Sequence, residues 1–550
     1  MTLVDPPTPT VVPSPDRSVE TIPRRDGVST RRRSPAPLLV RAIAVVIGLV
    51  TALAVALRFT GPRGLWLDEA LTVSIARLPI PRLFEALRHD GSPPGYYVLL
   101  HYWMGIFGTS THAVRALAAV ISAATLPVAW RLGRAIGGRW TAAVLVVVLA
   151  CNPFALRYGT ENRMYSLVML LATVAALALV RSLQRPTVWR LFGLGLACGL
   201  LLLTHYWALY LVGALGAMLL VFSIRGPVRS QARLALVAVA GGGLLFVPWV
   251  PSFLFQAQHT GTPWSTPPSA SMIVQAFGAF AGWDQLTGIA VFVFYLSAIV
   301  VLGGAVVVMT VPSAQGIARS LGWRRPVPGS RWAGPVAATF FMAMILGLAG
   351  GLLSGAAFAY RYASIVLPLI ALLVALGVIA ISRSRAGAVV AASVLLGIAM
   401  FGTTAGASEI AAQRTEANLV AASIVRDAHP GDLIAYCPDQ LGPAVSRLLP
   451  SRLYTQVTFP RWDDPSRINW VDYAQINAAT NPAQFARDLL NMAGQHQLWL
   501  VWEGGYRTLG QSCQQLRNTL RLARPDWSDP VRSQPRTYYE HENLARFLAE

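Results

Sequence analysis

The chain has 550 residues, of which 54% are hydrophobic and only 13% are charged. A water-soluble protein of this length cannot bury so large an apolar fraction in one core, so lipid must solvate much of the chain. The formal net charge is +20, but the arginines gather between hydrophobic spans, which is typical of cytoplasmic loops in membrane proteins. The composition therefore excludes an ordinary soluble protein, and the charge does not indicate a nucleic-acid partner.

Residues 1–37 are rich in proline, serine, threonine and arginine. Such a composition cannot form a packed core, so we predict a disordered tail. Its arginines favour the cytoplasmic side of the membrane. The tail is too long and too polar before its apolar stretch to resemble a cleaved signal peptide.

Hydrophobic spans follow one another through residues 38–406, and most approach the roughly 20 residues that a helix needs to cross a bilayer. The run 190–223 is too long for one crossing, so we divide it at 204–207. The pattern predicts a polytopic α-helical membrane domain with about 11 to 13 transmembrane helices. The spans lie at 38–58, 112–131, 139–156, 163–181, 190–204, 206–223, 233–256, 287–311, 332–354, 358–381 and 387–406.

The apolar segment 94–108 is short, about 15 residues, and fits either a crossing or a helix that lies along the interface. If it does not cross, the arginine-rich connections all fall on the cytoplasmic side of the plasma membrane, whereas a crossing would put them outside. We therefore predict an interfacial helix. The loop 59–95, the segment 157–163 and the C-terminal region then share the extracytoplasmic side.

The C-terminal stretch 407–550 lacks long apolar runs and returns to a soluble composition. Short apolar strands alternate with helical patterns in it, which predicts a small extracytoplasmic α/β domain. The expected strands lie at 432–437 and 497–503, and the expected helices at 409–427, 482–494 and 509–522.

The four cysteines do not form a disulfide scaffold. Cys151 and Cys198 lie in apolar spans and are expected to be small core residues. Cys437 and Cys513 lie in the C-terminal region and can form a disulfide if that region is extracytoplasmic. Spacing alone does not decide between this disulfide and two free thiols.

Two adjacent carboxylates, Asp68 and Glu69, follow the first hydrophobic span within the run LWLDEA at 65–70. Ionisable side chains at the membrane boundary are costly, so they indicate a functional site. The alternative is structural, because acidic residues also stabilise the first turn of a helix.

These carboxylates belong to an ordered series of motifs that resembles the GT-C membrane glycosyltransferases, above all the branch of protein O-mannosyltransferases and aminoarabinose transferases. The resemblance extends over residues 60–380 in order and spacing. The motifs are LWLDEA (65–70), SPPGYY (92–97), RLGRAIGGR (131–139), NPF (152–154) with RYGTENRMY (157–165), THYW (204–207) and YRYASIVLP (360–368).

The resemblance implies an integral-membrane enzyme that transfers a sugar from a polyprenyl-phosphate donor on the extracytoplasmic face. Mannose is the first expected sugar and arabinose the second, and the acceptor would be an envelope glycan, a glycolipid or an exported protein. The alternative function is a transporter or flippase of a lipid-linked solute. Transporters often contain repeated halves and broken helices near the midplane, and the sequence has no such repeat.

The resemblance assigns Asp68 as the general base that deprotonates the acceptor, and Glu69 as the group that orients the acceptor or tunes the pKa of Asp68. Glu161 and Arg163 match a second polar motif of the family, from which this sequence departs at Thr160 and Asn162. The structural alternative for Glu161 and Arg163 is a surface ion pair of little energetic value.

Arg361 matches the arginine that the family resemblance places on the lipid phosphate, which the planar guanidinium fork suits. The alternative is an arginine that snorkels at a helix end.

Four further polar residues are candidates for substrate contact: His205, Tyr206, His89 and Asp90. A lone histidine such as His205 is more often an interfacial hydrogen-bonding residue. One histidine beside one aspartate is a weak metal signature, so we predict no metal ligands and no certain cofactor, and leave a divalent cation open.

Overall fold

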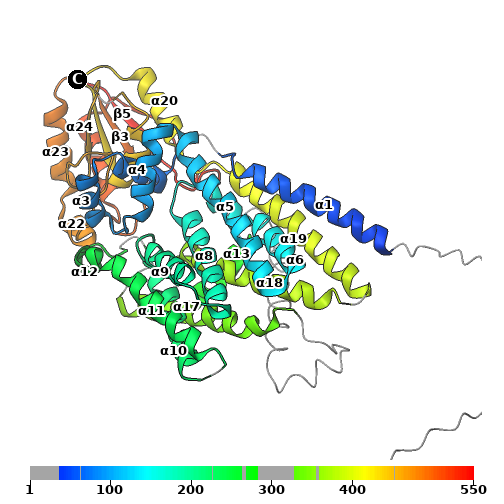
Figure 1. Cartoon of the computed structure of the whole chain (residues 1–550). Helices are drawn as coiled ribbons and strands as arrows, with labels where there is room; N and C mark the ends of the chain where they lie inside the picture. Colours follow the sequence, from blue (N-terminus) through cyan, green and yellow to red (C-terminus); the bar gives the residue numbers. More distant parts are fainter. Residues whose placement is uncertain are drawn as a thin grey trace, which may run out of the picture.

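A computed structural model describes residues 36–549 except 62–63, 226, 263–264, 266–267, 283–327, 355–357, 384 and 451. A helical body carries a small mixed domain at one end, and the C-terminus lies in that domain (Figure 1). The expected tail up to residue 35 and the expected span at 287–311 lie outside the described residues.

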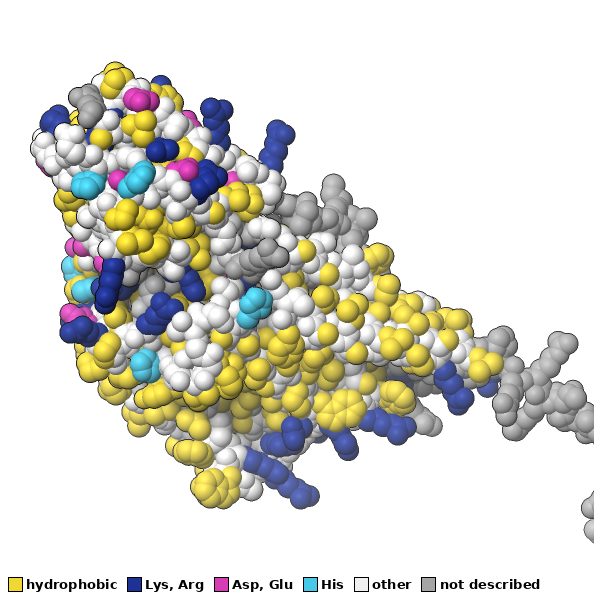
Figure 2. All heavy atoms as spheres, turned by 90° about the horizontal axis from the view of Figure 1, so that it is seen from above, with side chains coloured by type: hydrophobic (Ala, Val, Ile, Leu, Met, Phe, Trp, Pro, Cys, Tyr) yellow, Lys and Arg dark blue, Asp and Glu magenta, His cyan; other side chains and the backbone are white. Residues whose placement is uncertain are grey.

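The helical body contains seven described helices or helix runs that are long and apolar enough to cross a membrane, or eight when one bent pair counts as a span. Hydrophobic side chains dominate its surface, whereas acidic, basic and histidine side chains mix on the C-terminal domain (Figure 2). This confirms a multi-pass membrane protein. The candidate spans are α1 (Ala36–Leu57), α5 (Thr111–Gly137), the bent pair α6 (Arg139–Ala150) and α7 (Pro153–Gly159), α8 (Tyr165–Gln184), the run α11 (Arg229–Gly243), η1 (Leu244–Trp249) and α12 (Val250–His259), η4 (Ser330–Trp332) with α17 (Ala333–Ser354), η5 (Tyr360–Val366) with α18 (Leu367–Ile381), and α19 (Arg385–Ala411).

Two shorter apolar helices complete the expected set within the described residues. The long run at 190–223 divides as predicted, into α9 (Val188–Leu202) and α10 (Ala208–Ile224). They have 15 and 17 residues, which is below the roughly 20 residues of a full crossing. A third short helix, α13 (Ser271–Phe280), lies between the expected spans 233–256 and 287–311.

A sharp bend of 62° separates α6 from α7. Asn152 caps α7, since its side chain accepts a hydrogen bond from the backbone of Ala155 at 3.0 Å. Pro153 occupies the first helical position, where its fixed φ angle favours a helix start and its missing N–H costs nothing. The sequence Asn-Pro therefore starts a new helix in a new direction, and α7 leads into the turn at 160–164.

Three short helices precede the second span: α2 (Leu67–Ala76), α3 (Ile80–Asp90) and α4 (Gly95–Phe107). The 13 residues of α4 are too few to cross a bilayer. Gly95 allows α4 to approach the α9–α10 turn, because its backbone N–H donates to the carbonyl of Leu203 at 2.7 Å. A Cβ at this position would lie 2.7 Å from the same carbonyl oxygen, so a side chain would force α4 away.

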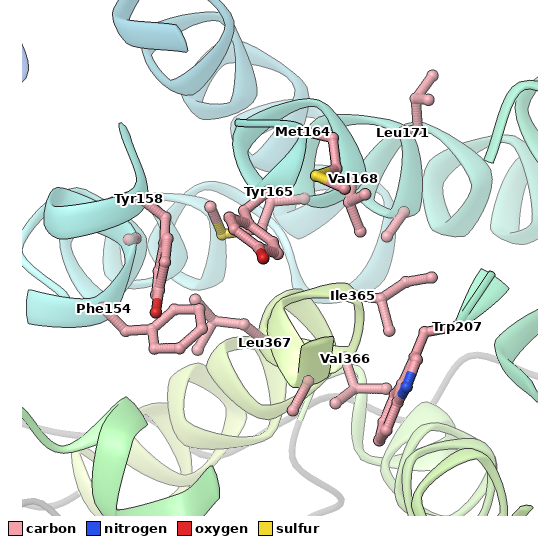
Figure 3. Close-up of a cluster of buried hydrophobic side chains, with 14 of the residues drawn as sticks. Phe154, Tyr158, Met164, Tyr165, Val168, Leu171, Trp207, Ile365, Val366 and Leu367 are labelled. Carbon is pink, nitrogen blue, oxygen red and sulfur yellow. The ribbon is translucent and has the colours of Figure 1, made fainter. Parts of the chain in front are cut away.

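An aromatic cluster fills the space where α7, α8 and η5 meet (Figure 3). Tyr158 and Tyr165 are both buried, and their ring centres lie 4.8 Å apart in an edge-on arrangement. The ring centres of Phe154 and Tyr158 lie 4.5 Å apart. Tyr158 and Tyr165 flank the turn at 160–164 in the sequence, so this aromatic cluster fixes both ends of the turn.

The C-terminal domain is built on a five-stranded mixed sheet with the strand order β2-β1-β3-β5-β4. Strand β1 pairs in parallel with both β2 and β3, with Ala435 of β1 opposite Leu500 of β3, and β5 runs antiparallel to both of its neighbours. The strands are β1 (Leu433–Cys437), β2 (Thr455–Thr458), β3 (Leu498–Trp502), β4 (Trp527–Val531) and β5 (Asn543–Phe547), and the helices are α20 (Ala417–Asp427), η6 (Asp439–Leu441), α21 (Gly442–Ser446), α22 (Tyr473–Ala479), α23 (Pro482–Ala493) and α24 (Ser512–Ala523). The predicted α/β domain is confirmed.

One expected helix of this domain is wrong in part. The range 409–427 was predicted as a single helix, but α19 ends at Ala411 and α20 begins at Ala417. The backbone between them pairs with the C-terminal segment instead, as Thr415 forms a bridge with Glu540. A tertiary contact therefore replaces helical hydrogen bonds.

Cys437 and Cys513 form a disulfide that joins β1 to α24. Cys151 and Cys198 are free and buried, as their apolar surroundings predicted. The fold decides the pairing that spacing left open, because the end of β1 lies next to the start of α24.

We predict that a digest of unreduced protein, purified from an oxidising compartment, yields one linked peptide containing Cys437 and Cys513. The C437S/C513S variant should lose about 2–4 kcal/mol of domain stability, because the unfolded chain is no longer cross-linked. Hydrogen exchange of β1 and β3 measures this loss, and Cys198→Ala, outside the domain, is the control. Alkylation of both Cys437 and Cys513 in unreduced protein would contradict the pairing.

Candidate functional site

The two adjacent acidic residues of α2, Asp68 and Glu69, differ in their exposure to solvent. Consecutive residues of a helix point about 100° apart, so Glu69 faces the interior when Asp68 does not. The side chain of Asp68 is 21% exposed, whereas that of Glu69 is completely buried. The pair therefore divides into one accessible and one inaccessible carboxylate.

Glu69 joins three parts of the chain. Its carboxylate accepts two hydrogen bonds from Arg115 of α5, one of them at 2.8 Å from Nε. It also accepts the backbone N–H of Asn162 at 2.9 Å. Burial raises the pKa of Glu69, but the charge and hydrogen bonds of Arg115 outweigh burial, so the pKa is lowered. These contacts occupy both oxygens of the carboxylate, so Glu69 positions α2. The sequence suggested that Glu69 orients the acceptor, but its buried carboxylate has no surface that an acceptor can reach.

Asp68 lies against Arg163. The Nε atom of Arg163 is 3.8 Å from Oδ2 of Asp68. Nη1 of Arg163 donates to the hydroxyl of Thr72 at 2.6 Å, and that hydroxyl donates to the backbone carbonyl of Asp68 at 2.6 Å. Arg163 thus holds the first turn of α2, and the carboxylate of Asp68 keeps an exposed side.

Arg361 lies within electrostatic reach of the same carboxylate, since Asp68 is among the charges that act on it. Its guanidinium carbon is 5.6 Å from the ring centre of Tyr362. The structure therefore brings Asp68, Arg163 and Arg361 into one cluster, although they are far apart in the sequence. We call these three residues the charged cluster.

His205 and Asp90 border the charged cluster. Burial and the positive charges of Arg163 and Arg361 lower the pKa of His205 to about 3, so this imidazole is neutral at physiological pH. Asp90 accepts a hydrogen bond from Tyr97 at 3.1 Å. Desolvation raises the pKa of Asp90 in spite of the nearby charge of Arg163.

Tyr206 and His89 have structural contacts instead. The hydroxyl of Tyr206 donates to Gln256 and accepts from the indole of Trp249 at 2.9 Å. The backbone carbonyl of His89 accepts from Trp470 of the C-terminal domain at 3.1 Å. Both residues help to pack α12 and the C-terminal domain around α3.

The structural alternative for Glu161 and Arg163, a surface ion pair between them, is wrong. Glu161 forms a buried ion pair with Arg414, while Arg163 turns to Asp68. The residues lie in a tight turn, where neighbouring side chains diverge. Burial raises the pKa of Glu161 more than the charge of Arg414 lowers it.

The C-terminal domain reaches the start of α2. No side chain near Trp66 caps this helix; instead the carboxyl group of Glu540 accepts the N–H of Leu67, with oxygens at 3.1 and 3.2 Å. The ring of Tyr539 meets that of Trp66 edge-on at 5.5 Å. A residue 473 positions away in the sequence thus caps the helix that carries Asp68.

Three residues of this arrangement were not predicted from the sequence: Arg115, Arg414 and Glu540. Arg115 carried a usable signal, because a charged residue at the start of an apolar span needs a buried partner. Arg414 and Glu540 carried none, since their importance arises only from tertiary contact.

A cavity of about 190 Å³ lies between α7, α13 and η5. Its lining includes Tyr158, Tyr360, and the ion pair of Arg157 with Glu409, whose charged atoms lie 2.8 Å apart. Among the described residues, no group of three or more histidine, cysteine, aspartate or glutamate side chains could hold a metal ion. The charged cluster itself offers one open carboxylate and two guanidinium groups.

Comparison with known proteins gives a family match in sequence. Residues 91–251 match the family described as dolichyl-phosphate-mannose-protein mannosyltransferase. This is less than a third of the chain, and it includes the turn with Glu161 and Arg163. No curated protein matches the chain.

Solved structures share the fold at low identity. ArnT from Cupriavidus metallidurans in the apo state is 15% identical with a TM-score of 0.49, covering 93% of this chain and 98% of that chain. The Archaeoglobus fulgidus oligosaccharyltransferase in complex with zinc and sulfate is 12% identical with a TM-score of 0.51, covering 83% and 68%. The archaeal oligosaccharyltransferase AglB with an inhibitory peptide and a dolichol-phosphate is 11% identical with a TM-score of 0.50, covering 84% and 69%.

We predict that Glu69→Gln destabilises the protein by about 3–5 kcal/mol, because it leaves the buried charge of Arg115 without its partner. Thermal unfolding of the purified chain measures the effect. Glu85→Gln, at an exposed site on α3, should change stability by no more than about 0.5 kcal/mol. Equal melting temperatures for the two variants would refute the structural role of Glu69.

The raised pKa of Glu540 predicts that the stability of the folded protein depends on pH. Burial raises its pKa to about 8, so the folded protein retains a proton that the unfolded chain loses near the ordinary value of 4.5. Its contribution to stability must therefore fall as pH rises from 4.5 to 8. Glutamine cannot ionise, so Glu540→Gln should gain stability relative to wild type over this range, measured as a growing difference in melting temperature between pH 5 and pH 8. A constant difference would contradict the raised pKa.

Proposed function

We propose that the chain is a membrane glycosyltransferase of the GT-C type, and that it moves a sugar from a polyprenyl-phosphate donor to an acceptor hydroxyl with Asp68 as the general base. The observation that carries this proposal is the charged cluster. It combines one accessible carboxylate, able to take a proton, with two arginines, able to bind phosphate.

In the proposed reaction, Asp68 takes the proton of the acceptor hydroxyl while the acceptor oxygen attacks the anomeric carbon. The bond between that carbon and the phosphate oxygen breaks, and the polyprenyl phosphate leaves with the electron pair. Arg163 and Arg361 stabilise the developing negative charge, because guanidinium groups bind phosphate oxygens through paired hydrogen bonds. The family resemblance implies inversion at the anomeric carbon.

The arginines also influence the base. Arg163 contacts Asp68 before substrate binds, and this contact holds the first turn of α2 in place. When Arg163 turns to a phosphate, Asp68 loses a competing partner and becomes free to accept a proton. Positioned general bases typically accelerate reactions about 10²- to 10⁴-fold.

Two findings support the donor class. The oligosaccharyltransferase AglB, which shares the fold, binds a dolichol-phosphate, and the matched family is described by dolichyl-phosphate-mannose. We therefore propose mannose as the first candidate sugar and arabinose as the second. The proposed acceptors are an envelope glycan, a glycolipid or an exported protein.

The proposed orientation places the charged cluster and the C-terminal domain outside the plasma membrane. The described arginine-rich connections 131–139 and 181–190 lie at the opposite ends of α5 and α8, and such connections favour the cytoplasm. The disulfide of the C-terminal domain agrees with an oxidising compartment.

We predict that Asp68→Asn lowers the turnover number about 10²- to 10⁴-fold, because the amide cannot accept the proton. The assay supplies radiolabelled decaprenyl-phosphate mannose, and separately arabinose, with a membrane extract as acceptor. Asp427→Asn, which changes a partly exposed aspartate paired with its neighbour Arg426, is the matched control and should keep its rate.

Since Asp68 is partly exposed, its asparagine variant should unfold at nearly the wild-type temperature. A near-normal transfer rate for Asp68→Asn would remove the general base from the proposal. Uptake of labelled donor into proteoliposomes without a covalent product would instead favour a transporter.

A further inference from the structure

A second hollow of about 680 Å³ opens at the far end of the bundle from the charged cluster. One face of α5 supplies Trp130, Arg131 and Arg134, and the end of α8 supplies Arg181. We call these four residues the arginine pocket. Arg131 lies 16 residues beyond Arg115 on α5, which corresponds to about 24 Å along the helix axis.

The three arginines of this pocket have no acidic partner among the described residues, where every ion pair involves other groups. The sequence explains why. Between Asp90 and Glu409 the chain contains only two acidic residues, Glu161 and Asp284. Glu161 is paired with Arg414 at the opposite end of the bundle. Three positive charges therefore converge without a counterion from the connections around them.

The position of the pocket matches the level of lipid head groups. Arg131 and Arg134 are exposed, and so are the indoles of Trp130 and Trp140 close by, at 38% and 65%. Tryptophan and arginine gather where a membrane meets water. Figure 2 shows basic side chains along the rim of the hydrophobic body, away from the C-terminal domain.

We propose that the arginine pocket binds the phosphate head group of an anionic phospholipid from the cytoplasmic leaflet. Guanidinium groups bind phosphate oxygens in pairs, and basic pockets between transmembrane helices recognise such head groups. A zwitterionic lipid gains less, because its ammonium group finds no carboxylate in the pocket. The indole of Trp130 at the rim suits the boundary between the head group and its acyl chains.

The test is a titration of the delipidated full-length chain in detergent with phosphatidylglycerol or phosphatidylcholine, followed by native mass spectrometry. Wild type should bind phosphatidylglycerol roughly tenfold or more tightly than phosphatidylcholine, and R131Q/R134Q/R181Q should lose this preference. The control R225Q/R229Q/R385Q removes three exposed arginines from other connections and should keep the preference within roughly threefold.

An equal loss in both triple variants would overturn the proposal, since the preference would then come from the overall charge. The same holds if wild type binds both lipids equally. Inorganic phosphate in equal amount should leave the lipid bound, and its displacement would assign the pocket to a free anion. If the triple variant unfolds, R134Q alone should weaken binding of phosphatidylglycerol roughly threefold, and R229Q alone should not. No sugar donor is present, so the result is independent of the proposed transfer reaction.

Discussion

The buried pair of Glu69 and Arg115 is the constraint on which the rest of the site depends. Charges removed from water must be compensated by close partners, and here the compensation joins α2 to α5 and, through Asn162, to the turn after α7. Because Glu69 is fixed toward the interior, its neighbour Asp68 lies on another side of α2 and keeps part of its side chain exposed. One residue of the acidic pair thus provides the rigidity that lets the other remain accessible.

A second layer of contacts joins the membrane body to the C-terminal domain. Arg414 binds Glu161, and Glu540 binds the start of α2. Both acids lie close to the charged cluster, so the C-terminal domain is part of the scaffold of the site. This interface also explains the break between α19 and α20, since the residues that leave the helix are those that pair with the C-terminal segment.

The fold could be predicted largely from the sequence. Each span is too long and too apolar to be exposed to water, and patterns typical of strands and helices alternate after residue 406. The candidate site could be predicted in part. Asp68, Arg163 and Arg361 were recognisable from charge near the membrane and from motif order. The partners could not be predicted: Glu161 binds Arg414, not Arg163, and this choice depends on backbone direction in one turn. Glu540 lies in a segment with no motif at all.

The capping of α2 by Glu540 has a consequence for biosynthesis. During translation the spans leave the ribosome first, and the helix with Asp68 enters the membrane boundary while most of the chain is still unmade. Its cap is missing until residue 540 has been added and the sheet has closed around β5. In each newly inserted molecule the start of α2 therefore lacks this contact until the last strand is in place, so premature stops near that strand would leave an inserted protein with an uncapped α2.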